Sequence, residues 1–130
     1  MSCPDISSAI ADLERRGYVR RMEERLLLLD ESHHQDWIHC HESYAMERWQ
    51  TLSSKDQQLL EDQPRMKAML LESGVAGTDF RSQIQPDGTF SPSVKCLHAH
   101  YAHFRSGGTL NLVGQWTHEM LSEQFPKLKL

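Results

Sequence analysis

Hydrophobic residues recur along this chain at the three- and four-residue spacing of amphipathic helices, in segments separated by glycine, proline and small polar residues. In the first segment Ile6, Ile10 and Leu13 form an apolar stripe, and Gly17 stands where a left-handed cap would end a helix. A helix over residues 4–16 is therefore predicted. The same pattern predicts further helices over residues 19–29, 30–52, 53–60, 64–73, 93–105 and 111–125.

Capping residues mark several of these boundaries. Asp30 or Ser32 can begin the long third helix, Ser53 or Ser54 the fourth, and Asn111 the last. The inward side of the third helix is predicted to carry an aromatic-rich set, namely Trp37, His41, Tyr44, Ala45 and Trp49.

Residues 74–92 are rich in glycine and proline and have little periodicity, which predicts a loop. Its length exceeds the usual connection, so it is expected to be functional or held by a partner. A tail over 125–130 is expected to be loose or docked. Because no segment alternates as a strand does, the predicted fold is all-α. We expect one domain over residues 1–130, with six or seven short helices, additionally pinned by a metal ion.

Composition and charge argue against several classes of function. The chain has 130 residues, with 14 basic and 18 acidic side chains and a net charge of −4, which argues against a nucleic-acid-binding module. No apolar run approaches the roughly 20 residues that span a bilayer. The first residues resemble neither a secretory signal nor a transit peptide. We therefore expect a soluble intracellular protein, mitochondrial if the source is eukaryotic and cytoplasmic if it is bacterial.

A cluster of metal-binding residue types lies between Val94 and His103. At about 100° per residue on a helix, Cys96, His100 and His103 share one face, and His98 points nearly the opposite way. Thiolate and imidazole both bind zinc well. The odd number and wide spacing of the cysteines also favour reduced thiols or metal ligands over a disulfide framework.

Two more residues can complete such a site: Cys3, at a predicted helix start, and His41, on the inner face of the third helix. One structural zinc ion is therefore the expected cofactor, with ligands drawn from Cys3, His41, Cys96, His100 and His103. The alternative is that the thiols are small buried hydrophobes. His41 and His103 would then be core histidines bonded to carboxylates such as Glu42 or Glu47.

Three enzymatic or reactive alternatives remain open. Cys96 with His100 would imitate a cysteine hydrolase, but no orienting residue is visible nearby. A redox sensor would need an exposed thiol of low pKa at Cys40. The competing enzyme class is a metal-dependent hydrolase whose site is formed by His41, Glu42, Cys96, His98 and His103.

Two sequence blocks resemble a known bacterial family. The first block comprises Cys3-Pro4, Ile10-Ala11-Asp12-Leu13-Glu14, Gly17, Glu24-Arg25-Leu26 and His41-Glu42-Ser43-Tyr44. The second comprises Val94-Lys95-Cys96-Leu97-His98, His103, Gly108, Asn111 and Val113-Gly114. Together they resemble the family named domain of unknown function 501, over most of the chain.

This chain departs from the family pattern in ways that suggest a shortened eukaryotic relative. Family members usually carry a further cysteine-containing segment before the Cys-Pro, whereas this chain starts there, which puts in doubt any activity that needs that segment. Cys40 replaces a small residue, and Leu112 stands where the family has proline.

The expected function is a non-enzymatic accessory subunit that binds other protein subunits of a larger assembly. The absence of a catalytic constellation, the long loop and the tail favour it. Through its eukaryotic relatives, the resemblance implies a peripheral accessory subunit of a mitochondrial respiratory complex, specifically the NADH dehydrogenase complex.

Overall fold

The computed structural model describes residues 5–107 and 109–130. These residues are mostly helical, with two isolated bridges and no strand among them, so the predicted all-α fold is confirmed. The α-helices are α1 (Ile6–Arg15), α2 (Tyr18–Leu27), α3 (Glu31–Gln50), α4 (Ser54–Glu61), α5 (Pro64–Glu72), α6 (Leu97–Arg105) and α7 (Leu112–Gln124), and the short 3₁₀ turns are η1 (Val75–Gly77) and η2 (Arg81–Gln83).

Local capping chemistry fixes most helix starts where the sequence predicts them. The Asp30 carboxylate accepts a hydrogen bond from the His33 amide at 3.0 Å, and Ser53 caps α4 in the same way. Gly17 adopts a left-handed backbone, with φ of 84°, between α1 and α2. These caps satisfy amide groups that the helix itself leaves without partners.

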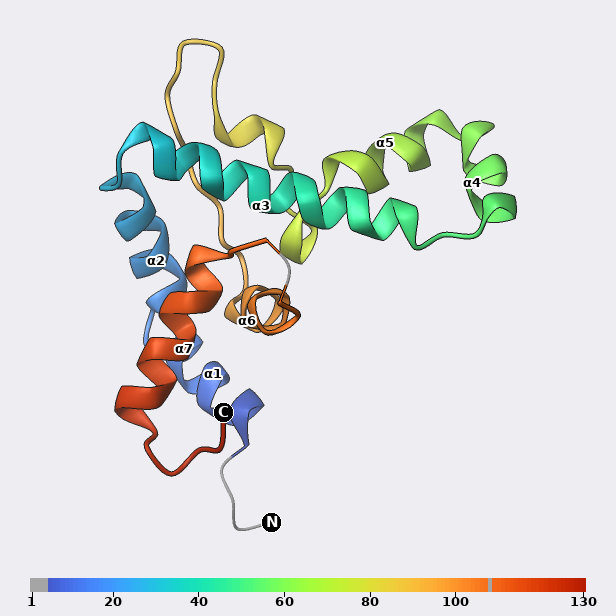
Figure 1. Cartoon of the computed structure of the whole chain (residues 1–130). Coiled ribbons are helices and arrows are strands. Elements are labelled where there is room, and N and C mark those ends of the chain that lie inside the picture. Colours follow the sequence, from blue (N-terminus) through green and yellow to red (C-terminus); the bar gives the residue numbers. More distant parts are fainter. Residues whose placement is uncertain (1–4, 108) are drawn as a thin grey trace.

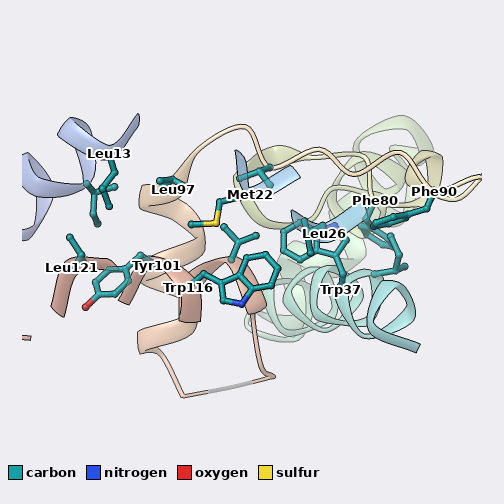
Figure 2. Close-up of a cluster of buried hydrophobic side chains, with 14 of the residues drawn as sticks. Leu13, Met22, Leu26, Trp37, Phe80, Phe90, Leu97, Tyr101, Trp116 and Leu121 are labelled. Carbon is teal, nitrogen blue, oxygen red and sulfur yellow. The ribbon is translucent and has the colours of Figure 1, made fainter. Parts of the chain in front are cut away.

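The hydrophobic core is elongated and lies mainly between α1, α2, α6 and α7 (Figure 2). Leu13 and Leu121 lie at one end of it, and Phe80 and Phe90 from the loop over 74–92 lie at the other. Trp37 joins the core from the N-terminal half of α3, and its indole N–H donates to the Gln83 side chain at 2.8 Å. The long loop is therefore anchored by its own buried residues.

Helices α6 and α7 cross at very close range. Gly114 permits this approach, because a Cβ built at that position would lie 2.4 Å from the His100 carbonyl oxygen and 2.4 Å from the Phe104 Cβ. The crossing fixes where α6 lies relative to α7. It thereby also fixes the positions of the histidines on α6.

Helices α4 and α5 project away from this core beside the C-terminal half of α3 (Figure 1). Neither contains a buried residue. We call residues 54–72 the arm. Arg48 fastens it by donating to the backbone carbonyls of Leu70 and Ser73, the latter at 2.8 Å.

The predicted inward face of α3 is therefore divided between two surroundings. Trp37, His41 and Ala45 are buried. Tyr44 and Trp49 are only half-buried: Tyr44 lies between Arg48 and the His103 ring, and Trp49 is covered by Lys67 of α5.

The structure corrects the predicted start of one helix and decides between the two options for the tail. Helix α6 begins at Leu97 and not at Ser93, because Lys95 has a φ of 64° and Cys96 is extended, so neither residue can continue a helix. In the tail, Leu128 and Leu130 pack against the core.

Within the described ranges, no helix combines the length and apolar character needed to cross a bilayer.

Candidate functional site

Three of the predicted ligands meet in the core as a buried histidine cluster, formed by His41 of α3 with His100 and His103 of α6. The His41 and His100 ring centroids are 5.6 Å apart. His41 Nδ1 accepts a hydrogen bond from the Val75 amide at 3.0 Å, and His100 Nε2 donates to the Val94 carbonyl at 3.0 Å. Both imidazoles thus already bind backbone groups.

Asn111 links this cluster to α7. Its side-chain oxygen accepts from the Gly114 amide at 3.0 Å and so caps the helix, as predicted. Its amide donates to Nδ1 of His100 at 2.9 Å and to Nδ1 of His103 at 3.2 Å. These bonds require both Nδ1 atoms to be unprotonated.

Burial keeps the cluster uncharged. Burial is the main cause that lowers the pKa of His41 to about 3, and the neighbouring His100 and His103 contribute to this shift. Burial also lowers the pKa of His100 to about 4. The pKa of His103 is lowered by burial as well, against the opposing effect of Glu47. Since a charged imidazole is poorly solvated in a core, all three rings are neutral at pH 7.

Cys96 does not join the buried histidines. In the part of the chain that the structure describes, no three of His41, Cys96, His100 and His103 bring ligand atoms within 4.8 Å of one another. Cys3, the remaining predicted ligand, lies outside the described residues. The four predicted ligands that the structure describes are thus divided between a core cluster and the N-terminal end of α6.

Cys40 does not have the properties of a redox-sensing thiol. It is fully buried, and burial raises the pKa of its thiol to about 12. A sensor needs an accessible thiol with substantial thiolate character. The sequence hypothesis of a sensor at Cys40 is therefore wrong.

A second group of metal-ligand types forms between α1 and α6. Glu14, Cys96 and His98 each offer a ligand atom, and these atoms lie within 4.8 Å of one another. Glu14 Oε1 lies 3.0 Å from His98 Nδ1, and Glu14 Oε2 accepts from the Leu97 amide at 2.9 Å. All three residues are neither buried nor fully exposed.

The angular prediction separated Cys96 from His98, because it assumed a helix that already includes Cys96. In the structure Cys96 is the extended residue that precedes α6, so the 100° spacing does not apply to it. The residue that the sequence analysis missed is Glu14. The Cys-x-His spacing at a helix start, together with the Leu13-Glu14 motif of the family, was the available signal.

Comparison with protein families gives a match over most of the chain. The model of a family described as protein of unknown function (DUF501) matches residues 1–119. No curated protein and no solved structure matches significantly. The matched range contains both histidine-containing groups and the whole arm. By this match, the chain belongs to the DUF501 family, as its sequence motifs indicate.

Proposed function

We propose that the chain is a non-enzymatic interaction subunit that joins a larger protein assembly through its arm. The observation that carries this proposal is the exposure of large apolar side chains on helices that bury none. Leu59 is 60% exposed, Met66 52% and Met69 65%, and Met46 on the adjoining part of α3 is 49% exposed. Single exposed apolar residues are ordinary, whereas several on one projecting element are typical of a binding surface.

The arm has little to stabilise it within the chain. Short helices are marginal in water and owe their stability mainly to packing of an apolar face. Here no side chain of α4 or α5 is fully buried, and polar contacts such as the 2.6 Å ion pair between Lys67 and Glu61 help to hold the two helices. A partner that covers Met66 and Met69, which lie one turn apart on α5, would supply the missing apolar packing.

Charge identifies the class of partner. Residues 54–72 carry three basic and four acidic side chains, so the arm has no positive surface for nucleic acid or an anionic membrane. Methionine side chains adapt to varied apolar surfaces, and amphipathic helices bind such surfaces in grooves or across helix pairs. The proposed occupant is therefore an amphipathic helix of another protein subunit.

The competing hypothesis of a hydrolase based on His41, Glu42, Cys96, His98 and His103 has less support. His41 and His103 are buried and neutral, and His41 is occupied by the Val75 amide. Glu42 is exposed, whereas its neighbour His41 is buried. A metal-activated water needs an accessible position that these side chains share.

More specifically, we propose that the assembly is a mitochondrial respiratory complex, the NADH dehydrogenase complex. Its support is the family resemblance of the eukaryotic relatives and not the geometry of the arm. It predicts that the chain comigrates with that complex on native gels of solubilised mitochondria from its own source.

A photo-crosslinking amino acid at position 69, introduced in the cells that naturally contain the chain, tests the arm directly. We expect one discrete adduct with a second protein. The same amino acid at Leu28, which is 87% exposed but lies outside the arm, is the matched control and should give no such adduct.

The identified partner is then purified and its affinity for the whole chain is measured. We expect the double substitution Met66→Asp and Met69→Asp to weaken binding at least about tenfold, since these side chains would be central contacts, while Leu28→Asp has little effect. Equal crosslinking at both positions, a self-adduct in a dimer, or unchanged affinity of the double variant would contradict the proposal.

A further inference from the structure

We infer that Glu14, Cys96 and His98 form a binding site for a divalent transition-metal ion of the zinc type, between α1 and the start of α6. This site lies outside the arm and is independent of the proposed partner binding. Of its three residues, Glu14 is in neither predicted metal site, and His98 is only in the alternative hydrolase site. The inference rests on ligand chemistry, on the contacts around each ligand and on the backbone at Lys95.

The ligand set is selective for its metal. A thiolate, an imidazole and a carboxylate together suit Zn²⁺ and its spectroscopic substitute Co²⁺, whereas Mg²⁺ and Ca²⁺ prefer oxygen ligands alone. Glu14 Oε1 and His98 Nδ1 are 3.0 Å apart. Two ligands at about 2 Å from a tetrahedral ion would be about 3.3 Å apart, so a small movement suffices for both to bind one ion.

The surroundings of His98 orient its ring as those of a metal ligand do. Its Nε2 lies 3.1 Å from the Ser7 carbonyl oxygen and 3.3 Å from the Ser7 hydroxyl. A proton on Nε2 that is donated to this carbonyl leaves the Nδ1 lone pair facing Glu14. Ligand histidines in proteins commonly donate their second ring nitrogen to a backbone carbonyl in this way.

Glu14 and Cys96 are also positioned by the start of α6. The second carboxylate oxygen of Glu14 accepts from the Leu97 amide, which fixes the carboxylate plane. Cys96 precedes the first turn of α6, and its side chain caps no amide there. The positive end of a helix dipole favours the thiolate, which is the form that binds metal.

The backbone before Cys96 is strained in a way that serves this arrangement. Lys95 has a φ of 64°, a left-handed conformation that costs a residue with a side chain free energy and that glycine usually occupies. Such outliers persist where the surrounding structure requires them, and they cluster at binding sites. Here the turn directs the chain so that Cys96 and His98 come together beside Glu14.

Coordination by these three side chains would join two helices that are distant in the sequence and leave room for a further ligand. Among the described residues the group has three members, whereas zinc is usually four-coordinate. The side chains of His98 and Glu14 are 37% and 26% exposed, so water or another ligand can reach the ion.

Titration of the purified, reduced full-length chain with Co²⁺ tests the site. We expect one Co²⁺ per chain and a thiolate-to-cobalt charge-transfer band, which Cys96→Ser abolishes. Glu14→Gln and His98→Gln should each weaken binding at least tenfold, since even loss of an outer partner of a ligand costs about 10- to 100-fold. Cys40→Ala and His39→Gln are the matched thiol and imidazole controls and should retain the band.

A second measurement does not depend on the variants folding. Saturating Zn²⁺ should protect Cys96 of the unaltered chain from alkylation, as mapped by mass spectrometry, whereas Mg²⁺ should not. Absence of the charge-transfer band, its persistence in Cys96→Ser, or equal alkylation of Cys96 with and without Zn²⁺ would overturn the inference.

Discussion

At the scale of single residues, Asn111 connects more of the molecule than the other caps predicted from the sequence, Asp30 and Ser53. Its oxygen begins α7, while its amide holds the unprotonated nitrogens of His100 and His103 on α6. The side chain is fully buried, so none of these bonds can be replaced by water. Loss of the amide leaves polar atoms of α6 and α7 without partners in the core.

Asn111→Ala should therefore destabilise the fold by about 3 kcal/mol, the sum of a lost helix cap and of buried hydrogen-bonding groups left unsatisfied. The measurement is the free energy of unfolding in urea. Ser53→Ala, which removes only an exposed cap on α4, is the control and should cost about 1 kcal/mol. Equal losses in the two variants would show that the link to the histidines contributes nothing.

At the scale of secondary-structure elements, capping and periodicity predicted the helices well because those signals are local. Asp30, Ser53 and Asn111 cap their helices within a few residues of sequence, and Gly17 separates α1 from α2. The start of α6 could not be predicted in this way. Its position depends on the left-handed Lys95, a conformation that tertiary contacts impose against the residue's own preference.

Arg48 attaches the arm to α3 by binding carbonyl groups at the end of α5. Arg48→Ala should leave the core intact and cost about 2 kcal/mol, because charged hydrogen bonds to part-buried carbonyls are lost. Hydrogen exchange of the amides in 64–72 should become faster, with no change in α7. Arg65→Ala, at an exposed position of α5, is the control. Faster exchange throughout the chain would contradict a local attachment.

At the scale of the whole molecule, the fold class could be predicted but the candidate metal site could not. An all-α fold follows from helical periodicity along the entire chain. The site depends on a contact between Glu14 and His98, which lie 84 positions apart and belong to helices whose packing no local pattern specifies. The prediction did place His41, His100 and His103 together, because each faces inward from its own helix.

The neutral histidines make the stability of the whole molecule depend on pH. The pKa of His41 is about 3 and that of His100 about 4 in the fold, below the value of about 6.5 in the unfolded chain. The unfolded state therefore binds protons first as the pH falls. The contribution of these two histidines to the free energy of unfolding should be complete above about pH 6.5. Below that pH, each histidine should lower the free energy of unfolding by about 1.4 kcal/mol per pH unit, which gives a decrease of about 4 kcal/mol between pH 7.5 and 5.

Urea unfolding at a series of pH values measures this decrease. His39→Gln changes an exposed histidine and should leave the pH dependence unaltered. Imidazole resonances of His41 and His100 that titrate near pH 6.5 in the folded protein would contradict the expected profile.

The unburied arm also bears on how much of this protein a cell retains. Helices without a buried side chain open far more often than a core does, and open segments are where proteases cut. Copies made in excess of the proposed partner would be removed by quality control, while bound copies would be spared. The steady-state amount of the chain would then follow the supply of its partner and not its own rate of synthesis.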